Sequence, residues 1–366
     1  MYTSSEKVLI WMSLVEGMTN AKADKLLSYY ERPIDIYKRL EQDAEIIKIA
    51  VGEAVYGRML KTTPGKMKAY LEMLENKGVK CVTRLSDDFP AKLSNIDNAP
   101  YILFCKGDTS LLNKRGVAVV GTRRPTAYGR ETTANFAKTL AERGLVIVSG
   151  LAEGVDKIAH ETTLKAGGKT IAVLASGFNT IYPAMNTNLA NQIAEEGLLV
   201  SEHRPDEKST KYAFITRNRI VSGLSDAVLI TEAAEKSGTM HTRDFALAQD
   251  RLIFAVPGNI TSKNSAGTNK IIKDMQAIMA IHPNDILLQL HIPLVSRYEE
   301  VEKPKVVVNQ SNSDEALIIK ALEDGEQTMD SLQEITKLST KTLNSYLTIL
   351  QIRGLIKKLP GNSYSI

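Results

Sequence analysis

The residues best suited to chemistry lie in a short turn between an apolar run and a helical pattern. The β-branched run 117–120 ends at Gly121, Arg123 and Arg124 follow, and a helical pattern begins near Ala127. A strand, a tight turn and a helix N-terminus form the geometry that binds phosphate. A dinucleotide site would place Gly-x-Gly-x-x-Gly here. Two bulky cations instead favour an open site that holds a polyanion from outside.

A second basic cluster contains aromatic side chains. Its cations are Arg204, Lys208, Lys211, Arg217 and Arg219, and it encloses Tyr212 and Phe214. Arginine and lysine neutralise phosphates, while an aromatic ring can stack on an unpaired base. A solvated, charged helix face explains most runs of charge. Here the arginines are mixed with apolar residues over 214–224, which favours a binding surface.

Several other turns that follow apolar runs contain glycine. They are Ser149-Gly150 with Gly154, Ser176-Gly177, Lys236-Ser237-Gly238-Thr239 and Pro257-Gly258-Asn259. In an open parallel sheet, ligands bind beyond the carboxyl ends of the strands. One such glycine is most often an ordinary turn residue. Four turns at one edge, together with the arginine turn, indicate a shared binding edge.

Catalytic patterns fit this chain poorly. Asp156 and His160 are one helical turn apart and could form an acid–base pair, but a helix-start carboxylate bonded to a histidine is at least as common. Glu232, close to the turn 236–239, is the best enzymatic candidate because a carboxylate beside a phosphate site could act on a nucleotide. A nucleotide-processing enzyme therefore stays open as the alternative to a nucleic-acid-binding protein.

Alternating strand and helix patterns must position these turns. Apolar runs with strand character occur at 116–121, 145–149, 170–175, 198–201, 226–231 and 251–256. Amphipathic helical patterns lie between them, for example at 127–142 and 186–196. This alternation predicts an α/β core with a mostly parallel sheet covered on both faces by helices.

The composition changes along the chain predict four parts. Residues 1–78 form an N-terminal helical domain, 79–291 form the core, and 292–313 have the proline and charge content of a linker. The last part, 314–366, shows helical patterns near 314–323, 328–336 and 340–353 and a hairpin turning at Pro360-Gly361. Three helices and a hairpin predict a winged helix. Its acidic first half and basic second half leave duplex DNA and a protein partner equally open.

Length and composition limit the class of protein. A chain of 366 residues with 43% apolar residues is expected to form two or three domains. The net charge is only +4, so any basic function depends on local clusters. No run resembles a signal peptide or a membrane anchor, and the two cysteines form no disulfide framework. We expect a cytoplasmic protein without a metal or another cofactor.

Many of these motifs, taken in order, resemble the DprA/Smf family. They are Gly121-Thr-Arg123, the stretch 149–160, Tyr182-Pro183, Ser201-Glu202, the stretch 214–220, Glu232, Lys236–Thr239 and Pro257-Gly258. The order and spacing agree over roughly 80–280, and the end of the chain resembles the winged-helix tail of the family. Several motifs in order are far more specific than any one of them.

The resemblance implies both a fold and a function. The fold would be an extended Rossmann-like core between an N-terminal helical domain of the SAM or helix-hairpin-helix kind and a C-terminal winged helix. The protein would be a non-enzymatic homodimer that binds single-stranded DNA and helps load RecA onto DNA covered by single-strand-binding protein. It would also protect incoming DNA in natural transformation, the process that defines competence.

The motif matches also imply site residues. The DNA contacts would be Gly121, Thr122, Arg123, Arg124, Gly150, Lys211, Phe214, Arg217, Asn218, Arg219, Lys236, Ser237, Gly238 and Thr239. Glu202, Asp156 and His160 would hold the turns in place. The family's N-terminal Gly-x-Gly hairpin is reduced here to Gly17-Met-Thr-Asn20, which leaves open whether that domain touches DNA.

Overall fold

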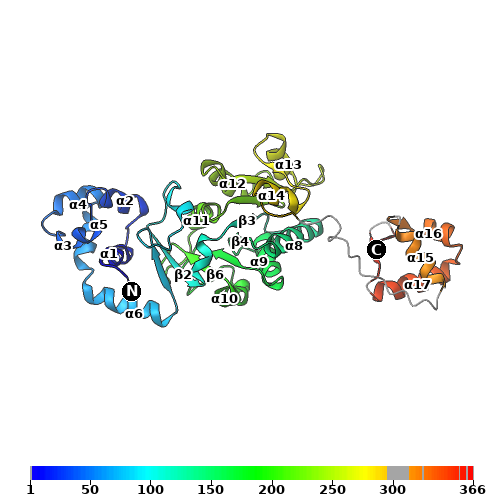
Figure 1. The fold of residues 1–366 in the computed structure, drawn as a ribbon, viewed down its shortest axis with the longest axis horizontal. Helices are drawn as coiled ribbons and strands as arrows, with labels where there is room; N and C mark the ends of the chain where they lie inside the picture. Colours follow the sequence, from blue (N-terminus) through cyan, green and yellow to red (C-terminus); the bar gives the residue numbers. More distant parts are fainter. Residues whose placement is uncertain (1, 295–312, 324, 354, 360–361, 366) are drawn as a thin grey trace. The chain divides into compact units, whose positions relative to one another are not determined.

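The computed structural model describes residues 2–294, 313–323, 325–353, 355–359 and 362–365 (Figure 1). The chain divides into two compact units, Met1–Leu294 and Val295–Ile366. Most of the predicted linker, 295–312, and the predicted hairpin turn Pro360-Gly361 lie outside the described residues.

Six helices form the first part of the chain. They are α1 (Ser4–Ser13), α2 (Asn20–Leu27), α3 (Pro33–Lys38), α4 (Ala44–Val51), α5 (Glu53–Lys61) and α6 (Pro64–Asn76). Thr3 and Glu6 form a capping box that satisfies the free N–H groups at the start of α1. The helices enclose the fully buried Trp11, and the same apolar cluster includes Ile102 and Phe104 from the sheet. The predicted boundary near 78 therefore marks a change of secondary structure within one packed unit.

A nine-stranded sheet follows. Its strands are β1 (Lys80–Thr83), β2 (Ile102–Gly107), β3 (Gly116–Val120), β4 (Val146–Ser149), β5 (Thr170–Val173), β6 (Leu198–Ser201), β7 (Ala227–Ile230), β8 (Leu252–Ala255) and β9 (Ile278–Met279). Their order is β1-β2-β6-β5-β4-β3-β7-β8-β9. The pairs β1–β2 and β2–β6 are antiparallel, and the other neighbours are parallel. The mostly parallel sheet and all six predicted strands are confirmed.

The sequence patterns missed three strands, all toward the edges of the sheet. Strands β1 and β2 form an antiparallel pair outside the strand–helix alternation, and β9 has only two residues. Every residue of β3 is buried, as expected for a strand covered on both faces. Most of β1 and β2 is buried, so they were missed because they lie outside the alternation, whereas β9 was missed because it is short and exposed.

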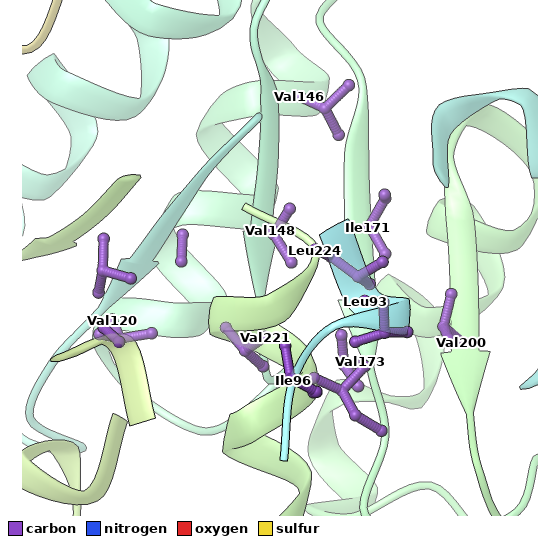
Figure 2. Packing of buried hydrophobic residues seen from close by; sticks show 14 of the residues in the cluster. Leu93, Ile96, Val120, Val146, Val148, Ile171, Val173, Val200, Val221 and Leu224 are labelled. Carbon is purple, nitrogen blue, oxygen red and sulfur yellow. The ribbon is translucent and has the colours of Figure 1, made fainter. Parts of the chain in front are cut away.

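Helices cover both faces of the sheet. They are α7 (Ala91–Ser94), α8 (Ala127–Glu142), α9 (Val155–Lys165), α10 (Thr187–Glu196), α11 (Lys211–Gly223), α12 (Thr239–Ala248), α13 (Ala266–Lys273) and α14 (Pro283–Gln289), with 3-10 turns at Thr109–Asn113 and Ala184–Asn186. Val148 and Val173 pack with Val221 of α11 in one core, which Figure 2 shows from close by. Ala172 packs on the other face with Leu164 of α9.

The second unit is a small helical domain with a three-stranded sheet. It contains α15 (Ser313–Glu323), β10 (Gln327–Thr328), α16 (Met329–Thr336), α17 (Thr340–Ile352), β11 (Lys357–Leu359) and β12 (Ser363–Ser365). The sheet order is β10-β12-β11. Leu322, Leu332 and Leu347 form its core with other apolar residues of the three helices. The predicted three helices and C-terminal hairpin are confirmed.

Candidate nucleic-acid interface

The sheet topology creates a crevice between β3 and β7. The chain leaves β3 for β4, β5 and β6 on one side, whereas β7 leads to β8 and β9 on the other. Because the connections diverge there, the turns beyond the carboxyl ends of β3 and β7 separate and leave a ligand site. A cavity of about 470 Å³ occupies this position.

The cavity brings together most of the predicted residues. Its lining includes Gly121, Arg123, Gly150, Lys211, Phe214, Arg217, Asn218, Ser237, Gly238 and Thr239. Thr122, Arg124, Arg219 and Lys236 do not line it. The predicted shared edge therefore exists, but only part of it forms the cavity.

Two of the predicted glycine turns face elsewhere. Gly177 packs against the backbone of Arg204 and Pro205, where an added Cβ would lie 1.9 Å from the Arg204 carbonyl oxygen. At Gly258, an added Cβ would lie 2.2 Å from Ser265 Oγ, and the backbone N–H and carbonyl both bond the Asn269 side chain. Close packing within the protein accounts for both glycines, so neither needs a ligand.

Glu232 holds the arginine turn against the sheet. Its carboxylate accepts hydrogen bonds from the Thr126 N–H and the Thr126 hydroxyl, both at 2.8 Å. Its backbone carbonyl accepts from the Thr122 N–H at 2.7 Å. Glu232 is only 1% exposed, and a Cβ at Gly129 would lie 2.2 Å from its Oε2. The carboxylate therefore fixes the start of α8 and is occupied by the protein itself.

The second turn is held by Asp156, as the sequence predicted. Asp156 Oδ2 accepts from the N–H groups of Gly150 and Ala152 at 3.2 and 3.3 Å. Gly154 has a φ of +84°, and a Cβ there would lie 2.5 Å from the Thr122 carbonyl oxygen. This close approach brings the second turn against the arginine turn. Burial raises the pKa of Asp156, and the nearby Arg217 guanidinium opposes that rise.

His160 is part of the same support. Its Nδ1 lies 2.7 Å from Thr170 Oγ1, and the Thr170 hydroxyl donates to the Ile147 carbonyl at 2.6 Å. The hydroxyl proton is therefore already used, which assigns the Nδ1–H donor to His160. Burial lowers the pKa of His160 to about 3, with a further contribution from the Arg217 charge. A neutral histidine bonded to a strand residue supports the fold and does not act as an acid–base pair with Asp156.

Arg217 forms the floor of the cavity. Its Nη1 donates to the carbonyl oxygens of Gly150 and Val173, and its Nε donates to Asn218 Oδ1 at 3.1 Å. Within the described residues, Nη2 has no hydrogen-bond partner, and the residue lines the cavity. Burial lowers the pKa of Arg217 to about 10, Asp156 opposes this, and Arg123 adds to it. A buried cation with a free donor is suited to an anion.

Arg219 has a different environment from the one predicted. Its side chain is 4% exposed and forms an ion pair with Glu202. Residues two positions apart on a helix point roughly 200° away from each other. Since Arg217 faces the cavity, Arg219 faces the opposite side of α11. The structure thus gives Arg219 a packing role, and Glu202 holds it in place.

The sequence interpretation missed one aromatic wall of the cavity. Tyr182, in the loop after β5, lines the cavity together with Phe214. The two rings meet edge to face, with centroids 5.1 Å apart and planes at 64°. Tyr182 is 52% exposed, so its ring is accessible. The signal that could have identified it was the Tyr182-Pro183 motif, which lies in the loop after a predicted strand.

The charge in the cavity suits a polyanion. The cations in its lining are Arg123, Lys211 and Arg217, and the only carboxylate is the buried Asp156. The first turn of α12, after Gly238, is closed by local contacts: the Thr239 N–H donates to Ser237 Oγ at 3.2 Å, and the Met240 N–H donates to the Ser237 carbonyl at 3.0 Å. Arg243, four residues after Thr239, does not line the cavity and contacts Asp244 and Gln276.

Two negative findings concern the described part of the chain. No helix in it combines the length and apolar character needed to cross a bilayer. These residues also contain no cluster of three or more His, Cys, Asp or Glu side chains that could hold a metal ion.

The fold and site define a Rossmann-like domain with a cationic crevice at its topological switch point. The family profile described as DNA recombination-mediator protein A matches residues 80–291, and that of the DprA winged helix domain matches 302–362. The chain belongs to the DprA/Smf family of DNA recombination mediators.

Relatives and solved structures agree with this assignment. DNA processing protein DprA of Bacillus subtilis is 39% identical over 253 residues, which cover 69% of this chain and 82% of that protein. Protein Smf of a Synechocystis strain is 30% identical over 375 residues, covering 90% and 94%. The crystal structure of DprA from Streptococcus pneumoniae has a TM-score of 0.69 and 32% identity, covering 80% of this chain and 99% of that one.

A second solved structure bears on the ligand. DNA processing protein A from Helicobacter pylori, described for its unique single-stranded DNA binding mode, has a TM-score of 0.54 and 35% identity. The match covers 58% of this chain and 95% of that one.

The contacts of Glu232 predict a cost to stability. In Glu232→Gln, an amide NH₂ replaces one acceptor oxygen and faces a donor of Thr126. We expect the free energy of unfolding to fall by about 1–3 kcal/mol, measured by urea denaturation. The control is Glu235→Gln, which removes an exposed ion pair with Lys270 and should cost less than about 1 kcal/mol. Equal stability of Glu232→Gln and the wild type would contradict the role of Glu232.

Proposed function

We propose that the crevice binds single-stranded DNA and that the protein acts as a non-enzymatic recombination mediator. The observation that carries this proposal is the pairing of three cations, Arg123, Lys211 and Arg217, with the rings of Tyr182 and Phe214 in one cavity. Phosphates bind the cations, and an unpaired base can stack on a ring. The H. pylori protein, which is described for its single-stranded DNA binding mode, supports the same ligand.

An enzymatic role has less support in the site. Glu232, the best catalytic candidate, uses both carboxylate oxygens on Thr126. Asp156 is buried and accepts two backbone hydrogen bonds. A general base must reach the proton that it removes, and neither carboxylate faces the cavity freely. Turnover of a nucleotide by the purified protein would favour the alternative, a nucleotide-processing enzyme.

The predicted contacts take different roles in this proposal. Residues that line the cavity contact the DNA directly. Arg124 and Lys236 are exposed beside it and add long-range attraction. Thr122 is neutral and shapes the turn by donating its N–H to the Glu232 carbonyl. Arg219 acts only by holding α11.

We also propose the partners that the family suggests. The protein would help load RecA onto DNA covered by single-strand-binding protein, and it would protect incoming DNA in transformable hosts. A homodimer is supported by strand β9, which is the edge strand of the sheet in the described part of the chain. The neighbouring apolar side chains Met275, Met279 and Ile281 are 92%, 50% and 70% exposed. An exposed apolar edge strand is a template for pairing with a second copy.

Arg123 gives the sharpest test of phosphate binding. Arg123→Ala should weaken binding of a labelled oligo-dT about 10-fold because a charge-assisted contact is lost. The slope of log K against log salt should decrease in magnitude by about 0.7, the value for one phosphate on a single strand. Fluorescence anisotropy over a salt series measures both.

Arg124→Ala is the matched control because it removes the same charge one residue away, outside the cavity lining. We expect a smaller loss of affinity. Equal effects of the two substitutions would contradict a specific site and would indicate a diffuse basic surface.

The ring pair predicts base stacking. Phe214→Ala and Tyr182→Ala should each cost about 1–3 kcal/mol of oligo-dT binding. Tyr212→Ala is the control because Tyr212 is 73% exposed on the same helix and does not line the cavity. An oligomer without bases should bind the wild type weakly, and its affinity should fall little further in Phe214→Ala. The same loss with both oligomers would exclude stacking at this position.

The mediator role predicts a gain in RecA assembly. The wild type should speed RecA filament formation on single-stranded DNA coated with single-strand-binding protein. The rate of ATP hydrolysis measures this formation. Arg123→Ala should lose this effect, whereas Arg124→Ala should keep most of it. A wild-type protein that binds oligo-dT but leaves RecA assembly unchanged would restrict the function to DNA binding.

A further inference from the structure

The reduced N-terminal hairpin docks on the sheet. Asn20, the first residue of α2, donates from Nδ2 to Glu202 Oε2 at 3.3 Å and to the Asn98 carbonyl at 3.4 Å. Its Oδ1 accepts from the Tyr101 N–H at 3.4 Å. Nearby, Arg84 at the end of β1 bonds Asp24 of α2. One polar side chain thus joins the helical domain to two separate segments of the core.

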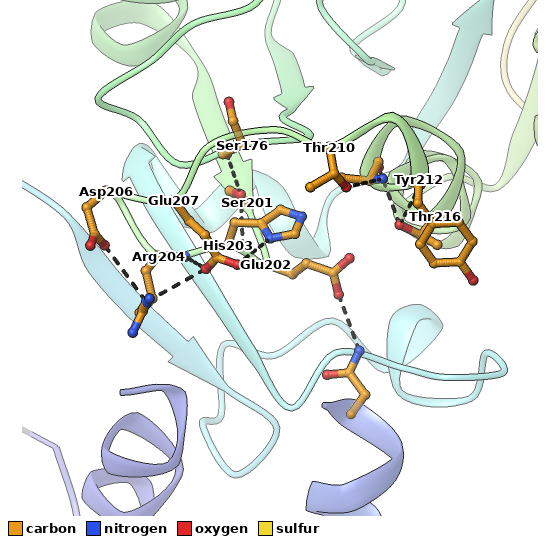
Figure 3. Close-up of polar contacts among 12 residues, drawn as sticks. Ser176, Ser201, Glu202, His203, Arg204, Asp206, Glu207, Thr210, Tyr212 and Thr216 are labelled. Atoms are coloured by element: carbon orange, nitrogen blue, oxygen red, sulfur yellow. Dashed lines mark hydrogen bonds and ion pairs between the residues drawn. The ribbon is translucent and has the colours of Figure 1, made fainter. Parts of the chain in front are cut away.

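The loop that follows β6 receives this contact. Figure 3 shows Glu202 extending from the loop toward the helical domain, with a hydrogen bond along that direction. Further along the loop, Arg204 Nη1 lies 3.5 Å from the Leu14 carbonyl of the helical domain. Thr210 then caps α11 by accepting from the Ala213 N–H at 3.2 Å. The loop therefore leaves β6, contacts the helical domain, and leads into the helix that carries Lys211 and Phe214.

Glu202 also contacts α11, and so links this helix to the helical domain. It forms an ion pair with Arg219, whose Nε and Nη1 are buried and have no partner in the described structure. Glu202 is therefore the counter-charge that makes burial of this guanidinium tolerable. Two residues earlier, Arg217 bonds the carbonyl oxygens of Gly150 and Val173. The helix is fixed on one side by Arg217 and on the other by Arg219.

We propose that Asn20 and Glu202 are positioning residues for the DNA site. Through Arg219 they set the position of α11, and so the helical domain contributes to the affinity of the cavity for single-stranded DNA without touching the DNA. The inference rests on the proposed function for its ligand, but the coupling from α2 to α11 stands on the contacts alone. Coupling between two sites is reciprocal, so DNA bound at α11 should strengthen the docking of α2.

Hydrogen exchange of the free protein tests the positioning directly. In Asn20→Ala, the amides of α11 should exchange faster than in the wild type, and those of the second unit should not change. Glu202→Gln should give a larger effect because it leaves Arg219 without a counter-charge; if this variant does not fold, Asn20→Ala carries the test. If the amides of α11 exchange at the wild-type rate in both variants, the proposal is overturned.

Oligo-dT binding tests the consequence. Asn20→Ala should weaken binding by about 3- to 10-fold, the range of substitutions that act through intervening residues. The salt slope should keep its wild-type value, because no phosphate contact is removed. DNA should also slow exchange of the α2 amides in the wild type and less so in Asn20→Ala.

Lys25→Ala is the matched control on α2, because Lys25 is exposed and its ammonium group bonds the Ile49 carbonyl of its own domain. It should bind oligo-dT like the wild type with the same salt slope. A reduced slope in Lys25→Ala would show that α2 contacts DNA directly and would overturn the proposal. A wild type that fails to bind oligo-dT would refute the proposed function, while exchange of α11 would still decide the coupling.

Discussion

The buried guanidinium of Arg217 is the interaction on which the site depends. Burying a charge is costly unless it is paired and hydrogen-bonded. Here the carbonyl oxygens of Gly150 and Val173 accept hydrogen bonds from its Nη1, and Asp156 supplies the negative charge. The guanidinium can lie there because Gly150 has no side chain, since a Cβ would be 2.4 Å from Nη2. These contacts fix α11 across the ends of β4 and β5 and leave one donor for a ligand.

The positions of the surrounding charged residues follow from the same need to pair and hydrogen-bond a buried charge. Asp156 and Glu232 both lie beneath the turns, where backbone N–H groups and Thr126 satisfy them. The acidic groups are therefore used to shape the turns, and the cations remain on the ligand side. The cavity lining therefore carries three cations and one buried carboxylate, an excess of positive charge that favours the approach of an anion. The two rings on its wall add a surface for a base, which a phosphate site alone would not need.

Much of the fold and part of the site could be predicted from the sequence. Buried parallel strands form continuous apolar runs, and glycines directly after such runs mark turns at one edge of a sheet. Gly121, Gly150 and Gly238 were found in this way. Gly177 and Gly258 gave the same signal, but close packing against Pro205 and Ser265 accounts for them. Local sequence does not show which backbone approaches a given glycine.

The side of a helix on which a residue functions was harder to predict. Arg217 and Arg219 have the same residue type and almost the same position, but they face opposite sides of α11. Only the location of Glu202, in another segment of the chain, decides which arginine is paired. The shared core of the helical domain and the sheet also depends on contacts between distant segments, such as that of Trp11 with the cluster around Phe104. Such contacts carry no local pattern.

A structure of the protein with a short oligo-dT would show directly whether the cavity holds DNA. We expect a phosphate within hydrogen-bond distance of Arg217 Nη2 and Arg123 at the floor of the cavity, with an adjacent base stacked on Phe214 or Tyr182. DNA ordered on another surface, with the cavity free of nucleotide, would contradict this expectation.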